Sequence, residues 1–122
     1  MSVVLDSSAV VAWIRQERGW EVVDLVLDRS TIASVNLVEI IEVLGRYGLN
    51  FDATQFPAML VEPFDLAQGV VAGALLSEHR SVGFSLGDAC CVALAMKLKA
   101  EVVTADQIWS RIRLPVPITI IR

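Results

Sequence analysis

The chain has 122 residues, of which 55% are hydrophobic, and a formal net charge of −4 at pH 7. Residues 1–122 are therefore long enough for a single domain with one sizeable core. Its longest apolar stretches, such as ACCVALAM, fall well short of the roughly 18 residues that span a bilayer, which excludes a membrane protein. The acidic balance also excludes the basic stripe of a typical DNA-binding module.

The start of the chain and its cysteine and histidine content narrow the class further. The N-terminus lacks the basic start and cleavage site of a secretory signal, so we expect a cytoplasmic protein. Cys90 and Cys91 are adjacent in an apolar helical stretch, which indicates core thiols rather than ligands. His79 is the only histidine, so a zinc site and a catalytic triad are not expected, and we place it at an exposed helix end.

Strands and helices alternate along the N-terminal half. The expected elements are a buried strand at residues 3–5, helices at 8–16 and 20–29, a strand at 31–34 and a helix at 35–48. The last of these has the strongest helical pattern, with one apolar face formed by Leu37, Ile40, Ile41 and Leu44.

The C-terminal half continues the alternation. The expected elements are a strand at 59–64, a helix at 66–80 capped by Asp65, a helix at 85–100, a strand at 101–104, a short helix at 106–112 and a strand at 117–121. Because parallel strands need crossover connections, this order predicts an α/β fold, an α/β/α sandwich with a central, mostly parallel sheet.

Four acidic residues fall in suggestive places on this frame. Asp6 ends the first strand, and Asp106 follows the strand at 101–104, so both lie at the sheet edge where α/β proteins bind ligands. Glu39 and Asp88 lie on helices that can pack over that edge. Taken singly, Asp6 and Asp106 are explained equally well as helix caps, and Asp88 as a first-turn residue that favours the helix dipole.

Glu39 is harder to explain as a structural residue. It lies three residues before Glu42 on the same helix face, where like charges repel. Arg46 is placed to pair with Glu42, whereas no basic residue follows Glu39 at the third or fourth position. Glu39 is therefore the better candidate for a functional site.

The four carboxylates together indicate a metal site. Carboxylates that converge in one cleft repel one another unless cations neutralise them. A set of oxygen ligands without sulfur selects Mg²⁺ or Mn²⁺, and such a site suits phosphodiester hydrolysis. Bound divalent ions would also let an acidic protein approach a polyanion.

Four segments resemble a known family: VVLDSSAVVAW, SVNLVEIIEVL, FSLGDACCVALAMKLKA and VVTADQIW. Together, in this order and over nearly the whole chain, they resemble the PIN domain, and more narrowly the VapC toxins of toxin–antitoxin pairs. The resemblance implies a Mg²⁺- or Mn²⁺-dependent endoribonuclease that uses a metal-activated water. It also implies catalytic, metal-binding roles for Asp6, Glu39, Asp88 and Asp106, with Ser8 and Thr104 orienting the carboxylates. Asp6 and Asp88 are expected to bind metal directly, Glu39 and Asp106 directly or through water.

The resemblance also implies partners. VapC toxins form homodimers and are inhibited by a cognate antitoxin whose C-terminal segment lies near the active site. Candidate anchors for partner contacts are Trp13, Trp20, Phe51, Phe56 and Met59, although tryptophans are also ordinary core residues. Arg15 is the preferred candidate for a contact with the RNA substrate, ahead of Arg18, Arg80, Arg111 and Arg113. Each of these arginines is also explained as a solvated surface charge.

The alternative function is a non-catalytic PIN-like module that binds RNA or a protein. The intact set of acids argues against it. Other phosphoryl enzymes fit less well, because a haloacid-dehalogenase-like phosphatase needs an aspartate where Ser8 stands, and a receiver domain needs an acidic pair after the first strand. Cleavage of DNA instead of RNA stays open on the chemistry alone.

Overall fold

The structure, a computed structural model, describes residues 2–50, 52 and 59–122. Its strands form one five-stranded sheet in the order β3-β2-β1-β4-β5, and every neighbouring pair is parallel. The strands are β1 (Val3–Leu5), β2 (Ser30–Ala33), β3 (Leu60–Glu62), β4 (Glu101–Thr104) and β5 (Ile118–Ile120).

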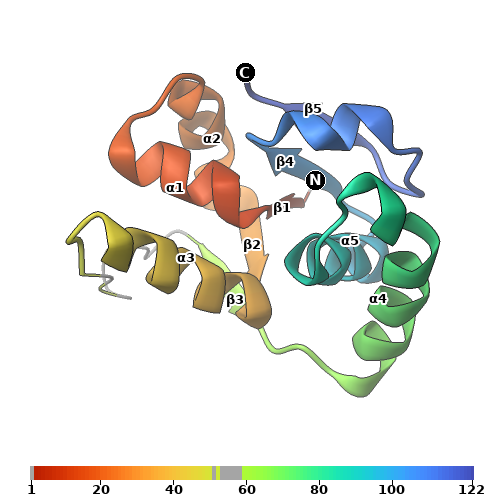
Figure 1. The fold of residues 1–122 in the computed structure, drawn as a ribbon. Helices are drawn as coiled ribbons and strands as arrows, with labels where there is room; N and C mark the ends of the chain where they lie inside the picture. Colours follow the sequence, from red (N-terminus) through yellow and green to blue (C-terminus); the bar gives the residue numbers. More distant parts are fainter. Residues whose placement is uncertain (1, 51, 53–58) are drawn as a thin grey trace.

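Helices cover both faces of this sheet. The α-helices are α1 (Ser7–Arg15), α2 (Trp20–Val26), α3 (Ser34–Arg46), α4 (Leu66–His79) and α5 (Leu86–Leu98). The short 3₁₀ helices are η1 (Leu27–Arg29), η3 (Arg80–Val82) and η4 (Gln107–Arg111). In Figure 1, α1, α2 and α3 lie on one side of the sheet and α4 and α5 on the other, which confirms the predicted α/β/α sandwich. Among the described residues, no helix is long and apolar enough to cross a membrane.

The central strand β1 divides the core into two halves. Val4 packs in the cluster formed mainly by α4 and α5, whereas Val3 and Leu5 pack in the cluster formed mainly by α1, α2 and α3. Side chains alternate between the two faces of a strand, so a central strand covered on both sides must be apolar throughout. This explains why an unbroken apolar run precedes Asp6.

Helix α5 is the core helix of the second half. Every residue from 87 to 95 is buried, including Cys90 and Cys91, as predicted for core thiols. Burial raises the pKa of both thiols above the usual value, which disfavours the reactive thiolate. The same helix begins with Asp88 in its first turn, at the edge where β1 ends.

Helix α3 departs from the predicted apolar face. Ile40 and Leu44 are buried, but Ile41 is 46% exposed, so its assignment to the buried face is wrong. The buried residues of the helix are Asn36, Ile40 and Leu44, which stand four residues apart and share one stripe. A polar residue therefore begins the stripe that faces the interior.

The two ends of α4 give one confirmed and one corrected prediction. Asp65 caps the helix, because its carboxylate accepts a hydrogen bond from Gln68 N (2.8 Å) and Gln68 Oε1 accepts one from Asp65 N (2.8 Å). His79 ends the helix as expected, but its side chain is only 15% exposed. Its ring meets that of Phe84 edge to face at 5.6 Å, and this contact keeps it from solvent.

Candidate active site

Asp6 lies between β1 and α1, where the first strand reaches the sheet edge. It occupies the N-cap position, but its side chain makes no capping bond, so the cap interpretation is wrong. Instead, its Oδ2 accepts hydrogen bonds from Ser8 Oγ (2.7 Å) and Thr104 Oγ1 (2.9 Å). The buried carboxylate thus faces the neighbouring strand β4.

Ser8 and Thr104 bind Asp6 together and join two segments of the chain. Ser8 Oγ accepts a hydrogen bond from Ala105 N (3.0 Å), and Thr104 Oγ1 accepts one from Asp106 N (3.1 Å). The two hydroxyls lie 3.2 Å apart. Because each hydroxyl also receives a backbone donor, its own proton is directed towards an acceptor. Ser8 and Thr104, for which the family resemblance implies a carboxylate-orienting role, therefore both contact Asp6.

Glu39 is held by polar side chains from two helices. Its Oε1 accepts hydrogen bonds from Ser7 Oγ (2.9 Å) and Asn36 Nδ2 (2.7 Å), and Asn36 also donates to Gly87 O (3.1 Å). The carboxylate lies against Gly87 so closely that a Cβ at this position would overlap it. Glu42, by contrast, pairs with Arg46 as predicted, at 2.6 Å.

Sequence reasoning missed Asn36 and Gly87. Asn36 is completely buried, and its Oδ1 has no hydrogen-bond partner among the described residues. The available signal was the stretch NLVEI, in which an asparagine stands one helical turn before Glu39 on the stripe that continues with Ile40 and Leu44. A buried amide in such a stripe needs a polar partner, and here the partner is Glu39.

Asp88 and Asp106 both begin helices, as their structural interpretations predict. Asp88 Oδ2 accepts a hydrogen bond from Ser85 N (2.9 Å), and Ser85 Oγ accepts one from Asp88 N (3.1 Å), which forms a capping box. Asp106 Oδ1 accepts a hydrogen bond from Ile108 N (3.0 Å) at the start of η4. Asp88 is buried and Asp106 is exposed.

The four acids form one electrostatic cluster. Burial raises the pKa of Asp6 to about 6, and the charges of Asp88 and Glu39 add to this rise against the lowering effect of the two hydroxyls. Burial also raises the pKa of Asp88, and the charges of Asp106 and Glu39 act in the same direction. These charge effects link Asp6, Glu39 and Asp88 to one another, and Asp106 to Asp88.

The chemistry of this cluster fits a hard cation. Its carboxylates are bound by hydroxyl, amide and backbone donors, whereas the salt bridges of the described residues involve other acids, namely Glu17, Glu42, Glu62, Asp65 and Glu78. In the described part of the chain, no three carboxyl, thiol or imidazole side chains are close enough to hold one ion. Two acids could bind a cation directly and the others through water, a pattern typical of Mg²⁺.

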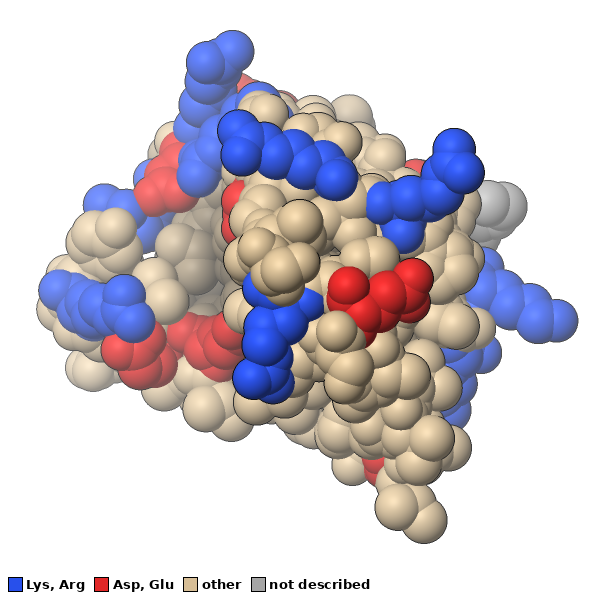
Figure 2. Space-filling model, turned by 45° about the vertical axis from the view of Figure 1, so that its right-hand side comes forward, with Lys and Arg blue, Asp and Glu red and all other residues tan. Residues whose placement is uncertain are grey.

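The arginines predicted as candidates for an RNA contact lie in different parts of the molecule. Figure 2 shows a hollow on one face of the molecule, with acidic side chains on its rim and basic ones around it. Arg15 forms a salt bridge with Glu17 (2.5 Å) and places its guanidinium 3.5 Å from the ring centroid of Tyr47. Arg18 and Arg80 are exposed, and Arg111 and Arg113 line a separate cavity beside η4.

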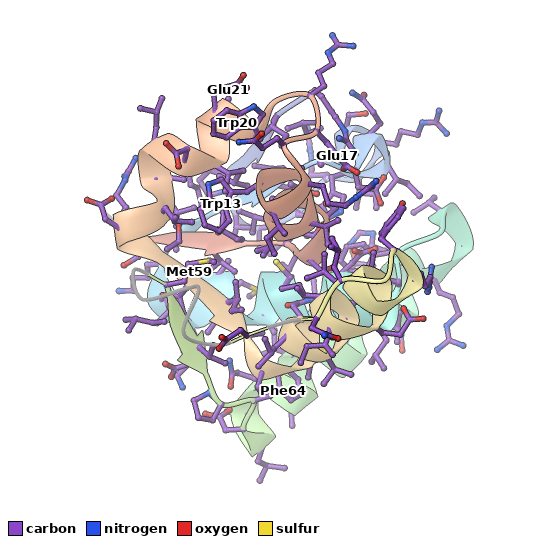
Figure 3. All side chains as sticks on the ribbon, turned by 90° about the vertical axis from the view of Figure 1, so that its left-hand side faces the viewer. Trp13, Glu17, Trp20, Glu21, Met59 and Phe64 are labelled. Carbon is purple, nitrogen blue, oxygen red and sulfur yellow. The ribbon has the colours of Figure 1, made fainter. Side chains whose placement is uncertain are left out.

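The residues predicted as anchors for partner contacts differ in how far they are buried. Trp13 and Trp20 are half-buried on α1 and at the start of α2, with Met59 below them in Figure 3. Met59 is only 7% exposed, because it packs in the core with α1 and α2, so its assignment as a surface anchor is wrong. Phe51 and Phe56 lie outside the described residues.

Several solved structures share this fold. A toxin–antitoxin complex from Klebsiella pneumoniae matches with a TM-score of 0.72 at 15% identity, covering 86% of this chain and 87% of the other. DNA-bound VapBC from Salmonella typhimurium matches with a TM-score of 0.69 at 18% identity, covering 98% and 97%. VapBC-5 from Mycobacterium tuberculosis matches with a TM-score of 0.64 at 21% identity, covering 100% and 99%.

Sequence comparison identifies the family. No curated protein matches the chain. The family model of the PIN domain, however, matches residues 3–114, which include all four acids and both hydroxyl residues of the cluster. The chain therefore belongs to the PIN domain family.

Proposed function

We propose that this protein is a Mg²⁺- or Mn²⁺-dependent endoribonuclease and the toxin of a toxin–antitoxin pair. The observation that carries the proposal is the position of Asp6, a buried carboxylate at the sheet edge that makes no capping bond and whose pKa is raised by burial and by the charges of Asp88 and Glu39. The PIN family match and the toxin–antitoxin complexes with the same fold support it. The preference for RNA over DNA rests on the family resemblance.

The acids would hold the cation, and their neighbours would hold the acids. When bound, Mg²⁺ or Mn²⁺ supplies the Lewis acid that phosphodiester hydrolysis needs. Ser8 and Thr104 position Asp6, Ser7 and Asn36 position Glu39, and the capping box positions Asp88. With a pKa of about 6, Asp6 is mostly ionised at pH 7 and available as a ligand.

The proposal extends to partners and location. We infer a homodimer in the cytoplasm, inhibited by a cognate antitoxin that reaches the acidic cluster with a basic side chain. Trp13 and Trp20, both half-buried, are the anchors that we propose for such a partner. Affinity purification of the protein from its native cells, followed by mass spectrometry and light scattering of the purified complex, measures both the partnership and the number of copies.

Cleavage of end-labelled total cellular RNA tests the activity. The protein, freed of antitoxin, is assayed with Mg²⁺, with Mn²⁺ and with EDTA, beside Asp6→Asn and the control Asp28→Asn, which makes the same change at an exposed site in η1. Discrete cuts that need metal, disappear in Asp6→Asn and persist in Asp28→Asn are expected. Full cleavage by folded Asp6→Asn protein would overturn the site.

The alternative is a PIN-like module that binds RNA or protein without cutting. It becomes the better reading if the antitoxin-free protein cuts none of the major RNA classes in either metal. In that case the hydrogen bonds of Asp88 and Asp106 at their helix starts are their whole role.

A further inference from the structure

A cavity of about 300 Å³ opens beside the acidic cluster, between α1 and α3. Its lining residues are Ser7, Ser8, Val11, Glu17, Val43, Tyr47 and Arg122. Ser7 and Ser8 are also the residues whose hydroxyls bind Glu39 and Asp6. The cavity therefore shares a wall with the cluster, and a molecule in it would lie one side chain away from the acids.

Glu17 in the lining of this cavity pairs with two arginines, of which Arg122 also lines the cavity and Arg15 lies behind Glu17 and Tyr47. Glu17 forms salt bridges with Arg15 at 2.5 Å and with Arg122 at 3.2 Å. All three side chains are about one-quarter to one-third exposed, so an anion can reach the guanidinium groups. The two guanidinium groups therefore place positive charge at this wall, where a phosphate could compete with Glu17 for them.

Tyr47 adds a flat apolar surface to the same wall. It follows the last residue of α3 and is 52% exposed, and the Arg15 guanidinium lies 3.5 Å from its ring centroid. Planar guanidinium and aromatic groups are the surfaces on which proteins stack unpaired nucleobases. The size of the cavity, at the lower end of ligand pockets, suits one nucleotide and excludes a duplex.

We propose that this cavity binds one unpaired nucleotide of the RNA substrate, next to the phosphodiester that is cut. The base stacks against the Tyr47–Arg15 pair, and the neighbouring phosphate binds Arg122, which exchanges part of its contact with Glu17 for the new anion. The inference rests on the proposed ribonuclease function. It makes Tyr47 a specificity-determining residue that selects single-stranded RNA.

Binding without cleavage tests the stacking contact. Fluorescein-labelled single-stranded oligo(A) and oligo(U) are titrated in EDTA with wild type, Tyr47→Phe, Tyr47→Leu and Tyr47→Ala, and fluorescence anisotropy gives Kd. Tyr47→Phe should bind as wild type, because it keeps the ring. Tyr47→Ala and Tyr47→Leu should bind at least about 5-fold more weakly, because both lose a planar surface of the kind on which bases stack. Equal Kd values for all four proteins would overturn the proposal.

The phosphate contact has its own test. Arg122→Ala should weaken binding, and it should reduce the slope of log Kd against the logarithm of the salt concentration by about one. The matched control is Lys97→Ala, which removes the same charge between Asp65 and Glu62, outside the lining of this cavity. Equal salt slopes for Arg122→Ala and wild type would contradict the phosphate contact.

Cleavage assays on the same proteins separate this inference from the proposed function. If wild type cuts RNA and Tyr47→Ala cuts it with unchanged KM and kcat, the nucleotide site is wrong and the ribonuclease stands. If wild type binds the oligonucleotides through Tyr47 but cuts no RNA in any metal, the nuclease is wrong and the nucleotide site stands. If wild type neither binds nor cuts RNA, both are overturned.

Discussion

Helices α4 and α5 begin with similar capping boxes, yet their aspartates have opposite electrostatics. Asp65 is exposed, and its pKa is lowered by the backbone N–H of Gln68 and by Lys97, whose Nζ lies 3.1 Å away. Asp88 is buried beside Asp106 and Glu39, and burial raises its pKa. The capping boxes thus differ in where the aspartate stands, since Asp65 is the N-cap residue of α4 and Asp88 is the third residue of α5. The charge of Asp65 is compensated, whereas that of Asp88 adds to the charges of Asp106 and Glu39.

The largest expected effect is on cleavage. Asp88→Asn should reduce the rate by about 100-fold or more, because changes even to groups that orient metal ligands cost 10- to 100-fold. Asp65→Asn, the same substitution at the N-cap position of the other capping box, should leave the rate unchanged. Rates are measured with Mg²⁺ on end-labelled RNA, and circular dichroism checks the fold. Equal losses in both variants would mean that the capping role explains Asp88.

The carboxylate of Asp6, which is expected to support cleavage, should lower the free energy of unfolding of the metal-free protein at neutral pH. Its carboxyl binds a proton more tightly in the folded chain, where its pKa is about 6, than at its ordinary value of 3.8. The folded chain therefore loses stability as the pH rises from about 4 to about 6, and the full loss corresponds to about 3 kcal/mol. Asp6→Asn should remove this penalty and raise the free energy of unfolding at pH 7.5.

Urea denaturation in EDTA at pH 4 and pH 7.5 measures this effect. The free energy of unfolding of wild type minus that of Asp6→Asn should be more positive at pH 4 than at pH 7.5. Mn²⁺ should stabilise wild type but not the variant. A variant that is less stable than wild type at pH 7.5 without metal would contradict the uncompensated charge at Asp6.

The hydroxyl of Thr104 should affect activity more than stability. Thr104→Val removes the hydrogen bond to Asp6 Oδ2 at nearly constant shape, so the pKa of Asp6 should rise further. We expect a 10- to 100-fold lower cleavage rate and an acid limb of the pH profile that moves to higher pH. The control is Thr119→Val in β5, whose hydroxyl binds Glu101 at 3.3 Å. An unmoved acid limb would exclude this role.

The smallest effect should come from the close approach of Gly87 to Glu39. In Gly87→Ala the new Cβ displaces the Glu39 carboxylate, a flexible group, so the expected result is a roughly 10-fold lower cleavage rate with little change in Tm. Gly73→Ala in α4 adds a methyl group with nothing within 4 Å and should stabilise the helix by about 0.5–1 kcal/mol without changing the rate. Similar cleavage rates for Gly87→Ala and Gly73→Ala would show that the close approach of Gly87 to Glu39 does not affect the site.

The sequence by itself determined the sheet, the helix order and the positions of the acids. The runs before Asp6 and before Asp106 are apolar because central parallel strands are covered on both faces, and this pattern is visible in adjacent residues. The cap at Asp65 and the Glu42–Arg46 pair were equally predictable, because both depend on residues within one helical turn.

Tertiary packing alone decided which side chains meet. The bond from Thr104 to Asp6 joins residues 98 positions apart, and the bond from Asn36 to Gly87 joins residues 51 apart, so no local pattern reveals them. The exposure of Ile41 and the burial of Met59 likewise depend on which neighbours cover each face. Local chemistry specifies what each residue can do, whereas burial and distant partners determine whether its charge is compensated.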